Sequence, residues 1–140
     1  MAGKTTFMKT IGVNLLLART LNICLAGSAN LPVVEVKTSI KRQDDLEDNK
    51  SYYYKEIESV LEFITLSKIS GNYIFLVDEI FRGTNTNERL SSATAVLNYL
   101  CKKNITMVTT HDLELQEFVD EKFEMYHFME QVENGVHFFD

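Results

Sequence analysis

Continuous apolar runs and helically spaced apolar residues alternate along this chain. Residues 73–77 and 105–110 form two short runs rich in β-branched and aromatic side chains. Runs of this length are typical of strands that are buried on both faces. Three other segments carry apolar residues at helical spacing, and each predicts a helix with one buried face. The predicted faces are Phe7, Ile11, Leu15 and Ala18; Tyr53, Ile57, Val60, Leu61 and Ile64; and Leu90, Ala93, Leu97, Leu100 and Cys101.

Weaker patterns complete the predicted order of elements. Residues 33–40 alternate in their second half, which predicts a strand that is solvated on one face. Residues 113–119 predict a short helix, and residues 123–129 and 136–139 predict an antiparallel hairpin at the sheet edge. A strand, helix, strand succession forms a right-handed parallel crossover. The predicted fold class is therefore α/β, with a mostly parallel sheet flanked by helices and an antiparallel edge hairpin.

Composition limits the possible functions of the chain. Its 140 residues suffice for one domain with a single core, and 45% apolar and 24% charged residues are ordinary for a globular protein. The net charge of −6, without a run of Lys or Arg, excludes a stand-alone nucleic-acid binder. Cys24 and Cys101 lie far apart, which indicates reduced thiols in a cytosolic protein. No apolar stretch is long enough to span a bilayer, so we expect a cytoplasmic location and no membrane partner.

Charged side chains follow both predicted central strands. Asp78 and Glu79 end the first, and His111 follows the second. The carboxyl ends of parallel strands meet at one edge of a sheet, where open α/β sheets bind ligands. A rigid strand end can hold a carboxylate against a metal ion or an attacking water. Two alternatives stay open at this point: the acids begin an ordinary solvated loop, and His111 is a loop histidine without a chemical role.

The tripeptide Gly3, Lys4 and Thr5 immediately precedes the first predicted helix. It matches the second half of the P-loop pattern G-x-x-x-x-G-K-[ST]. In that loop, backbone N–H groups cradle phosphates, the lysine reaches the β/γ-phosphates and the hydroxyl binds Mg²⁺. The first glycine of the pattern has no counterpart here. Alone, the tripeptide is a weak signal, and Lys4 as an ordinary solvated charge stays an alternative.

In this order, the motifs resemble those of one known family. Residues 1–9 resemble the phosphate loop of the MutS mismatch-repair ATPases from its fourth residue onward. Residues 78–86 resemble the family's Walker B segment with its following loop, and residues 109–112 its histidine switch. Residues 44–46 and 51–53 resemble its signature loop. The resemblance spans nearly the whole chain and implies an ATPase domain with the ABC-type P-loop NTPase fold.

The resemblance implies how ATP and Mg²⁺ would be bound. Lys4 would neutralise charge on the β/γ-phosphates, while Gly3 and Thr6 would belong to the phosphate-binding loop. Thr5 and Asp78 would hold Mg²⁺, Asp78 directly or through water.

It also implies catalytic roles. Glu79 would orient and deprotonate the attacking water, and His111 would contact the γ-phosphate or that water. Ser51 would reach the γ-phosphate bound to a second subunit, so the active form would be a homodimer with two composite sites. From the residues alone, Ser51 is equally well placed as the N-cap of the second predicted helix.

The sequence departs from the family pattern in three places. The first three residues of the phosphate loop and the strand before them have no counterpart, and we expect that strand to lie beside residues 73–78. Asn49 replaces the usual glycine of the signature loop, and the sequence ends at Asp140 within a strand pattern. We therefore expect residues 1–140 to be a single partial MutS-type ATPase domain, truncated at both ends.

The function implied by the resemblance is ATP binding and hydrolysis in a MutS-like DNA mismatch-repair protein. Nucleotide state would be coupled to mismatched-DNA binding through dimerisation, and parts of a longer parent would contact the DNA. Two alternatives remain: a non-catalytic dimerisation module, and another ABC-type ATPase of DNA repair or transport. A transporter domain would normally carry L-S-G-G-Q, which residues 48–51 do not match.

Overall fold

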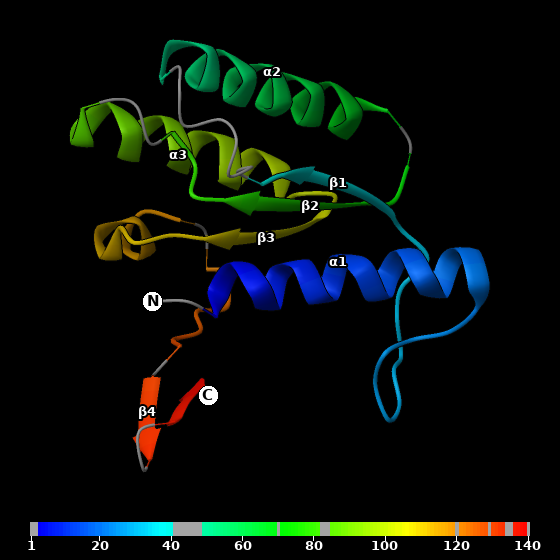
Figure 1. Ribbon diagram of the computed structural model, residues 1–140. Coiled ribbons are helices and arrows are strands. Elements are labelled where there is room, and N and C mark those ends of the chain that lie inside the picture. The colour runs from blue at the N-terminus through cyan, green and yellow to red at the C-terminus, as the bar shows by residue number, and fades with distance from the viewer. Residues whose placement is uncertain are drawn as a thin grey trace.

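A three-stranded parallel sheet forms the centre of the molecule (Figure 1). Its strands are β1 (Glu35–Ser39), β2 (Tyr73–Asp78) and β3 (Ile105–Thr109), in the order β1-β2-β3. The computed structural model describes residues 3–40, 49–69, 71–81, 85–119, 121–128, 130–133 and 136–139. The predicted α/β class and parallel crossover are confirmed.

Helices cover both faces of this sheet. In Figure 1, α2 (Asn49–Lys68) and α3 (Thr86–Leu100) lie on one face, and α1 (Lys4–Leu21) lies on the other. A short 3₁₀ helix, η2 (Leu113–Glu117), follows β3. All three long helices begin at the end of the sheet where the strands end (Figure 1). The helix N-termini and the strand carboxyl ends therefore share one edge of the molecule.

The continuous apolar run in β2 is explained by burial on both faces. Its residues 74–77 are at most 5% exposed. Because side chains alternate along a strand, Phe75 and Val77 join the core beneath α2 and α3, whereas Ile74 and Leu76 join the core beneath α1. α1 approaches closely because Gly12 has no side chain: an added Cβ would lie 2.9 Å from Leu76 Cδ1.

The expected position of a further strand was wrong. β2 pairs with β1 on one side and with β3 on the other, so neither of its edges is available. Among the described strands, β1 and β3 form the edges of the parallel sheet. A further strand in this sheet would have to pair with one of these two.

Two predicted helix faces are rotated from those observed. In α1 the buried residues are Met8, Gly12 and Leu15, whereas Phe7 is 47% exposed. In α2, Phe63 is buried and Leu61 is 56% exposed. Both helices carry more apolar residues than one sheet-facing stripe can bury. The stripe that becomes buried is therefore set by packing on the sheet rather than by the pattern alone. In α3 the predicted residues Leu90, Ala93, Leu97 and Leu100 are buried as expected.

The predicted hairpin at the sheet edge was also wrong. β4 (Glu130–Glu133) and β5 (Val136–Phe139) do pair antiparallel, but they form a separate two-stranded sheet. Residues 123–128, expected to be its first strand, have no regular structure. Phe128 packs on Phe7 of α1, with ring centroids 5.4 Å apart. Alternating residues predict a strand but do not specify which sheet it joins.

None of the helices in the described part of the chain is long and apolar enough to cross a membrane.

Candidate functional site

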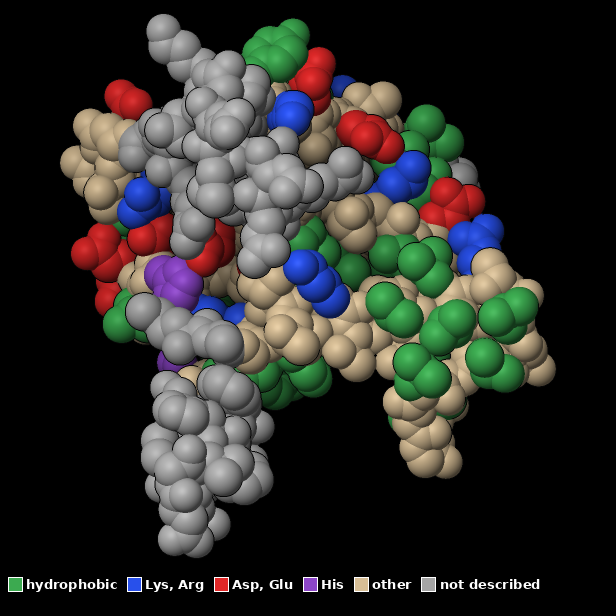
Figure 2. Space-filling view, in the orientation of Figure 1, with side chains coloured by type: hydrophobic (Ala, Val, Ile, Leu, Met, Phe, Trp, Pro, Cys, Tyr) green, Lys and Arg blue, Asp and Glu red, His purple; other side chains and the backbone are tan. Residues whose placement is uncertain are grey.

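The side chains singled out by their sequence motifs meet at the carboxyl edge of the parallel sheet. Asp78 and Glu79 come from the end of β2, His111 follows β3, and Lys4 and Thr5 begin α1. Figure 2 shows acidic, basic and histidine side chains gathered at this end of the molecule. The predicted common edge is therefore confirmed.

Asp78 is held by two hydroxyl groups. Thr5 Oγ1 donates to Asp78 Oδ1 at 2.8 Å, and Thr109 Oγ1 donates to the same oxygen. Thr109 lies on β3 directly beside Asp78 in the sheet register and is 7% exposed. The carboxylate is thus fixed between α1 and β3.

The oxygen atoms of Thr5 and Asp78 are the donor type that suits Mg²⁺. Magnesium commonly binds through one or two carboxylates and keeps several waters or substrate oxygens. The described residues contain no group of three or more His, Cys, Asp or Glu side chains able to enclose a metal ion by themselves. The two oxygen atoms of Thr5 and Asp78 fit the small set of protein ligands that Mg²⁺ commonly takes.

Lys4, His111 and Glu79 form a connected chain of polar contacts. Lys4 Nζ donates to the Thr110 carbonyl at 2.7 Å and lies 3.3 Å from His111 Nδ1. His111 Nε2 lies 2.9 Å from Glu79 Oε1. A neutral imidazole that carries its proton on Nε2 satisfies both ring contacts. The ammonium and the carboxylate thereby fix the orientation of the ring.

Glu79 occupies an unusual backbone conformation. Its φ angle is 58°, in the left-handed region that non-glycine residues rarely adopt. Its amide donates to the Thr109 carbonyl at 3.0 Å, and its side chain is only 17% exposed. The strand therefore turns sharply after Asp78, and the two adjacent carboxylates have different surroundings. Such outliers concentrate at functional sites.

The start of α1 has the backbone geometry of a helix N-terminus that could hold an anion. Gly3 adopts a φ of 122° and precedes the helix without a side-chain cap, and its carbonyl accepts from the Phe7 amide at 2.7 Å. Unsatisfied N–H groups and the helix dipole favour a negatively charged ligand there. Thr6 lies in this first turn and is exposed.

The assignment of Ser51 as an N-cap was wrong. α2 begins at Asn49, so Ser51 lies inside its first turn. Three parts of the predicted site lie outside the described parts of the chain: the side chains of residues 51–53, residues 44–46 of the signature loop, and residues 82–84 after β2.

The sequence motifs did not identify the ion pair between Arg89 and Asp112, which lies beside the site. Arg89, in the first turns of α3, donates to Asp112 Oδ1 at 2.8 Å, and both side chains are mostly buried. The Asp112 amide donates to Thr110 Oγ1 at 3.0 Å. Thr110 and Asp112, the two neighbours of His111, are therefore hydrogen-bonded to each other. Asp112 is also bonded to Arg89 of α3. The only available signal was an acidic residue immediately after the histidine.

Together, the fold and site define an α/β domain with carboxylates at its strand ends beside the N-terminus of α1. The family model described as MutS domain V matches residues 1–139. The chain therefore belongs to the MutS domain V family.

Individual relatives agree with this family. The chain is 36% identical over 126 residues to the DNA mismatch repair protein MutS of Clostridium perfringens, covering 86% of this chain and 14% of that protein. It is 35% identical to the protein of the same name from Thermus aquaticus, covering 82% and 14%. It is 33% identical to MutS protein homolog 4 of Mus musculus, covering 82% and 12%. The chain thus spans only 12–14% of the length of these relatives.

Proposed function

We propose that this chain is an ATP-binding and ATP-hydrolysing domain with the ABC-type P-loop NTPase fold, acting within a MutS-like DNA mismatch-repair protein. The observation that carries the proposal is the convergence of Lys4, Thr5, Asp78, Glu79 and His111 at one sheet edge. Similarity to proteins named DNA mismatch repair protein MutS supports the cellular role.

The phosphate groups of ATP would lie at the start of α1. The N–H groups of the first helical turn after Gly3 would face the phosphates, and the Lys4 ammonium lies near the same sheet edge, where it donates to the Thr110 carbonyl. To reach the β/γ-phosphates, Lys4 exchanges its contact with the Thr110 carbonyl for phosphate oxygens. Thr5 and Asp78 would hold Mg²⁺, which neutralises phosphate charge when bound.

Glu79 is the candidate general base. Its carboxylate is mostly buried and adjoins His111, so it can accept a proton from a water positioned beside the γ-phosphate. His111 would hold that water or a phosphate oxygen, since its ring is already oriented by Lys4 and Glu79. The reaction class is phosphoryl transfer to water, in which positioning and charge stabilisation dominate.

The wider assembly is part of the same proposal. A second copy of the domain would supply Ser51 to the γ-phosphate, which gives a homodimer with two composite ATP sites. Other parts of the parent protein would bind mismatched DNA. The relatives are many times longer than this chain, which is consistent with a domain that works within a larger protein.

The direct test replaces Glu79 by Gln in a full-length parent protein. We expect ATP binding to persist and steady-state hydrolysis to fall on the order of 10²–10⁴-fold, because general-base assistance is lost. Glu88→Gln, an exposed glutamate at the start of α3, is the matched control and should retain wild-type turnover. If Glu79→Gln hydrolyses ATP within a few-fold of wild type, Glu79 is not the base. If the wild-type protein binds ATP without turnover, the domain is a non-catalytic module.

A further inference from the structure

We infer that Glu56 of α2 is a positioning residue for Glu79, because it holds the turn after β2 in the conformation that presents the Glu79 carboxylate to His111. The effect of Glu56 on catalysis rests on the proposed function, in which Glu79 is the base. The contact itself is a property of the fold.

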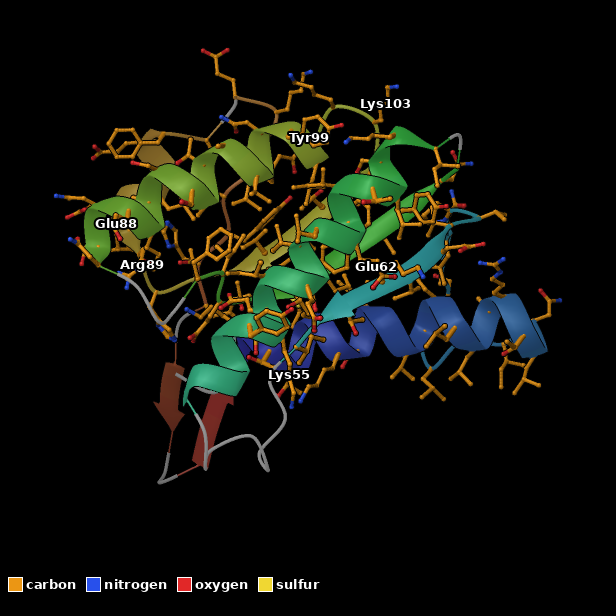
Figure 3. All side chains as sticks on the ribbon, turned by 90° about the horizontal axis from the view of Figure 1, so that it is seen from above. Lys55, Glu62, Glu88, Arg89, Tyr99 and Lys103 are labelled. Atoms are coloured by element: carbon orange, nitrogen blue, oxygen red, sulfur yellow. The ribbon has the colours of Figure 1, made fainter. Side chains whose placement is uncertain are left out.

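Glu56 is an unusual residue on the buried face of α2. It is 5% exposed and shares that face with Val60 and Phe63, which lie one and two turns further along the helix. Figure 3 shows α2 crossing the sheet, with the labelled neighbour Lys55 near its beginning and Glu62 further along. Burying a carboxylate is unfavourable unless the group is paired or hydrogen-bonded. A glutamate on this face therefore needs a specific partner.

One such partner is the backbone of the turn after β2. Glu56 Oε1 accepts a hydrogen bond from the Phe81 amide, 25 residues away in the sequence. Phe81 is itself only 8% exposed, so its N–H group would have little access to water if the carboxylate were removed. A bond from an N–H group to an ionised carboxylate is also stronger than one between neutral groups.

The turn that Glu56 holds is strained at two positions. Glu79 and Phe81 both have φ angles of 58°, and Ile80 between them is 4% exposed. Left-handed conformations of bulky residues persist only when their surroundings fix them. One end of this turn is fixed by the Glu79 amide bonded to the Thr109 carbonyl, and the other by the Phe81 amide bonded to Glu56. Without Glu56, the second end can relax and move the Glu79 carboxylate away from His111.

The first experiment measures the turn without reference to activity. Backbone hydrogen exchange of residues 79–81 is compared in the full-length parent and its Glu56→Ala and Glu56→Gln variants. Glu58→Ala, an exposed change on the same helix, is the control. We expect exchange at Phe81 to become on the order of ten-fold faster in Glu56→Ala, because its amide loses its acceptor. Glu56→Gln keeps an acceptor oxygen and should lie closer to wild type. Unchanged exchange at Phe81 in Glu56→Ala would overturn the inference.

The second experiment separates positioning from a general loss of structure. Glu56→Ala should lower kcat for ATP roughly 10–100-fold while KM changes less than about three-fold, because a small displacement of a catalytic group slows chemistry more than binding. In a Glu79→Gln background the same change should add less than about a two-fold loss, since the positioned group is already gone. A loss that is equally large in both backgrounds contradicts positioning.

The two experiments distinguish failure of this inference from failure of the proposed function. If Glu79→Gln leaves turnover unchanged, the proposed role of Glu79 as the base fails, and the exchange rate at Phe81 alone decides whether Glu56 holds the turn. If Glu79→Gln abolishes turnover but Glu56→Ala keeps the wild-type kcat, the proposed function stands and the role of Glu56 is refuted.

Discussion

Asp78 and Glu79 are adjacent in the sequence, yet the fold supports them in opposite ways. Asp78 ends a regular strand, and hydroxyl groups from α1 and β3 hold its carboxylate. Glu79 lies in a left-handed turn that backbone hydrogen bonds fix from β3 and, through Phe81, from α2. Hydroxyl groups therefore hold the carboxylate of the residue proposed to bind the metal, whereas the proposed base is positioned through the backbone amides of its turn. Changes to these two supports should affect different steps.

One of the two hydroxyl contacts of Asp78 can be removed without altering the Glu79 turn backbone. Thr109→Val deletes the buried hydroxyl that donates to Asp78 but keeps the shape of the side chain. We expect the Mg²⁺ concentration for half-maximal ATPase activity to rise roughly ten-fold, because a group that orients a metal ligand is lost. Activity at saturating Mg²⁺ should change much less.

A neighbouring threonine offers a matched control for this change. Thr106 lies on the same strand, and its buried hydroxyl has no hydrogen-bond partner among the described residues. Thr106→Val should leave the Mg²⁺ dependence unchanged and raise the free energy of unfolding by up to about 1 kcal/mol, since an unsatisfied polar group is removed. Equal Mg²⁺ dependence in the two variants would show that Thr109 does not support Asp78.

A smaller effect is expected where α3 supports the residues around His111. A double-mutant cycle with Arg89→Ala and Asp112→Ala should give a coupling free energy of about 1 kcal/mol, because both side chains are mostly buried. The exposed pair between Lys37 and Glu62 is the comparison, and its coupling should be at most about 0.5 kcal/mol. Thermal and denaturant unfolding of the parent protein supply both values. Equal coupling free energies in the two pairs would show that Arg89 stabilises Asp112 no more than an exposed ion pair does.

Hydrophobic pattern and strand order predicted the framework of this site well. The apolar run before Asp78 predicted a two-face-buried strand, and the parallel crossover predicted that His111 would share its edge. The same reasoning failed for the faces of α1 and α2, since Phe7 and Leu61 are apolar but lie outside the buried stripes. It failed again for the terminal hairpin, because pairing partners depend on tertiary packing.

The groups that support the site were harder to foresee than the site itself. In the sequence, Thr109 looks like any other β-branched residue of a strand. Its hydroxyl can contact Asp78 only because the sheet register places the two residues side by side. Glu56 resembles an ordinary exposed helix glutamate until the turn of Phe81 places an amide against it. Such contacts join residues tens of positions apart, and no local pattern encodes them.

The central claim is that one sheet edge binds ATP·Mg²⁺ through Asp78 and hydrolyses it through Glu79. Calorimetric titration of ATP with Mg²⁺ into full-length Glu79→Gln and Asp78→Asn proteins tests this division directly. We predict that Glu79→Gln binds within about three-fold of wild type, since the base is not needed for binding. Asp78→Asn should bind roughly 10–100-fold more weakly with Mg²⁺ present, and this difference should vanish when Mg²⁺ is chelated. Equal affinities of the two variants in the presence of Mg²⁺ would contradict the account.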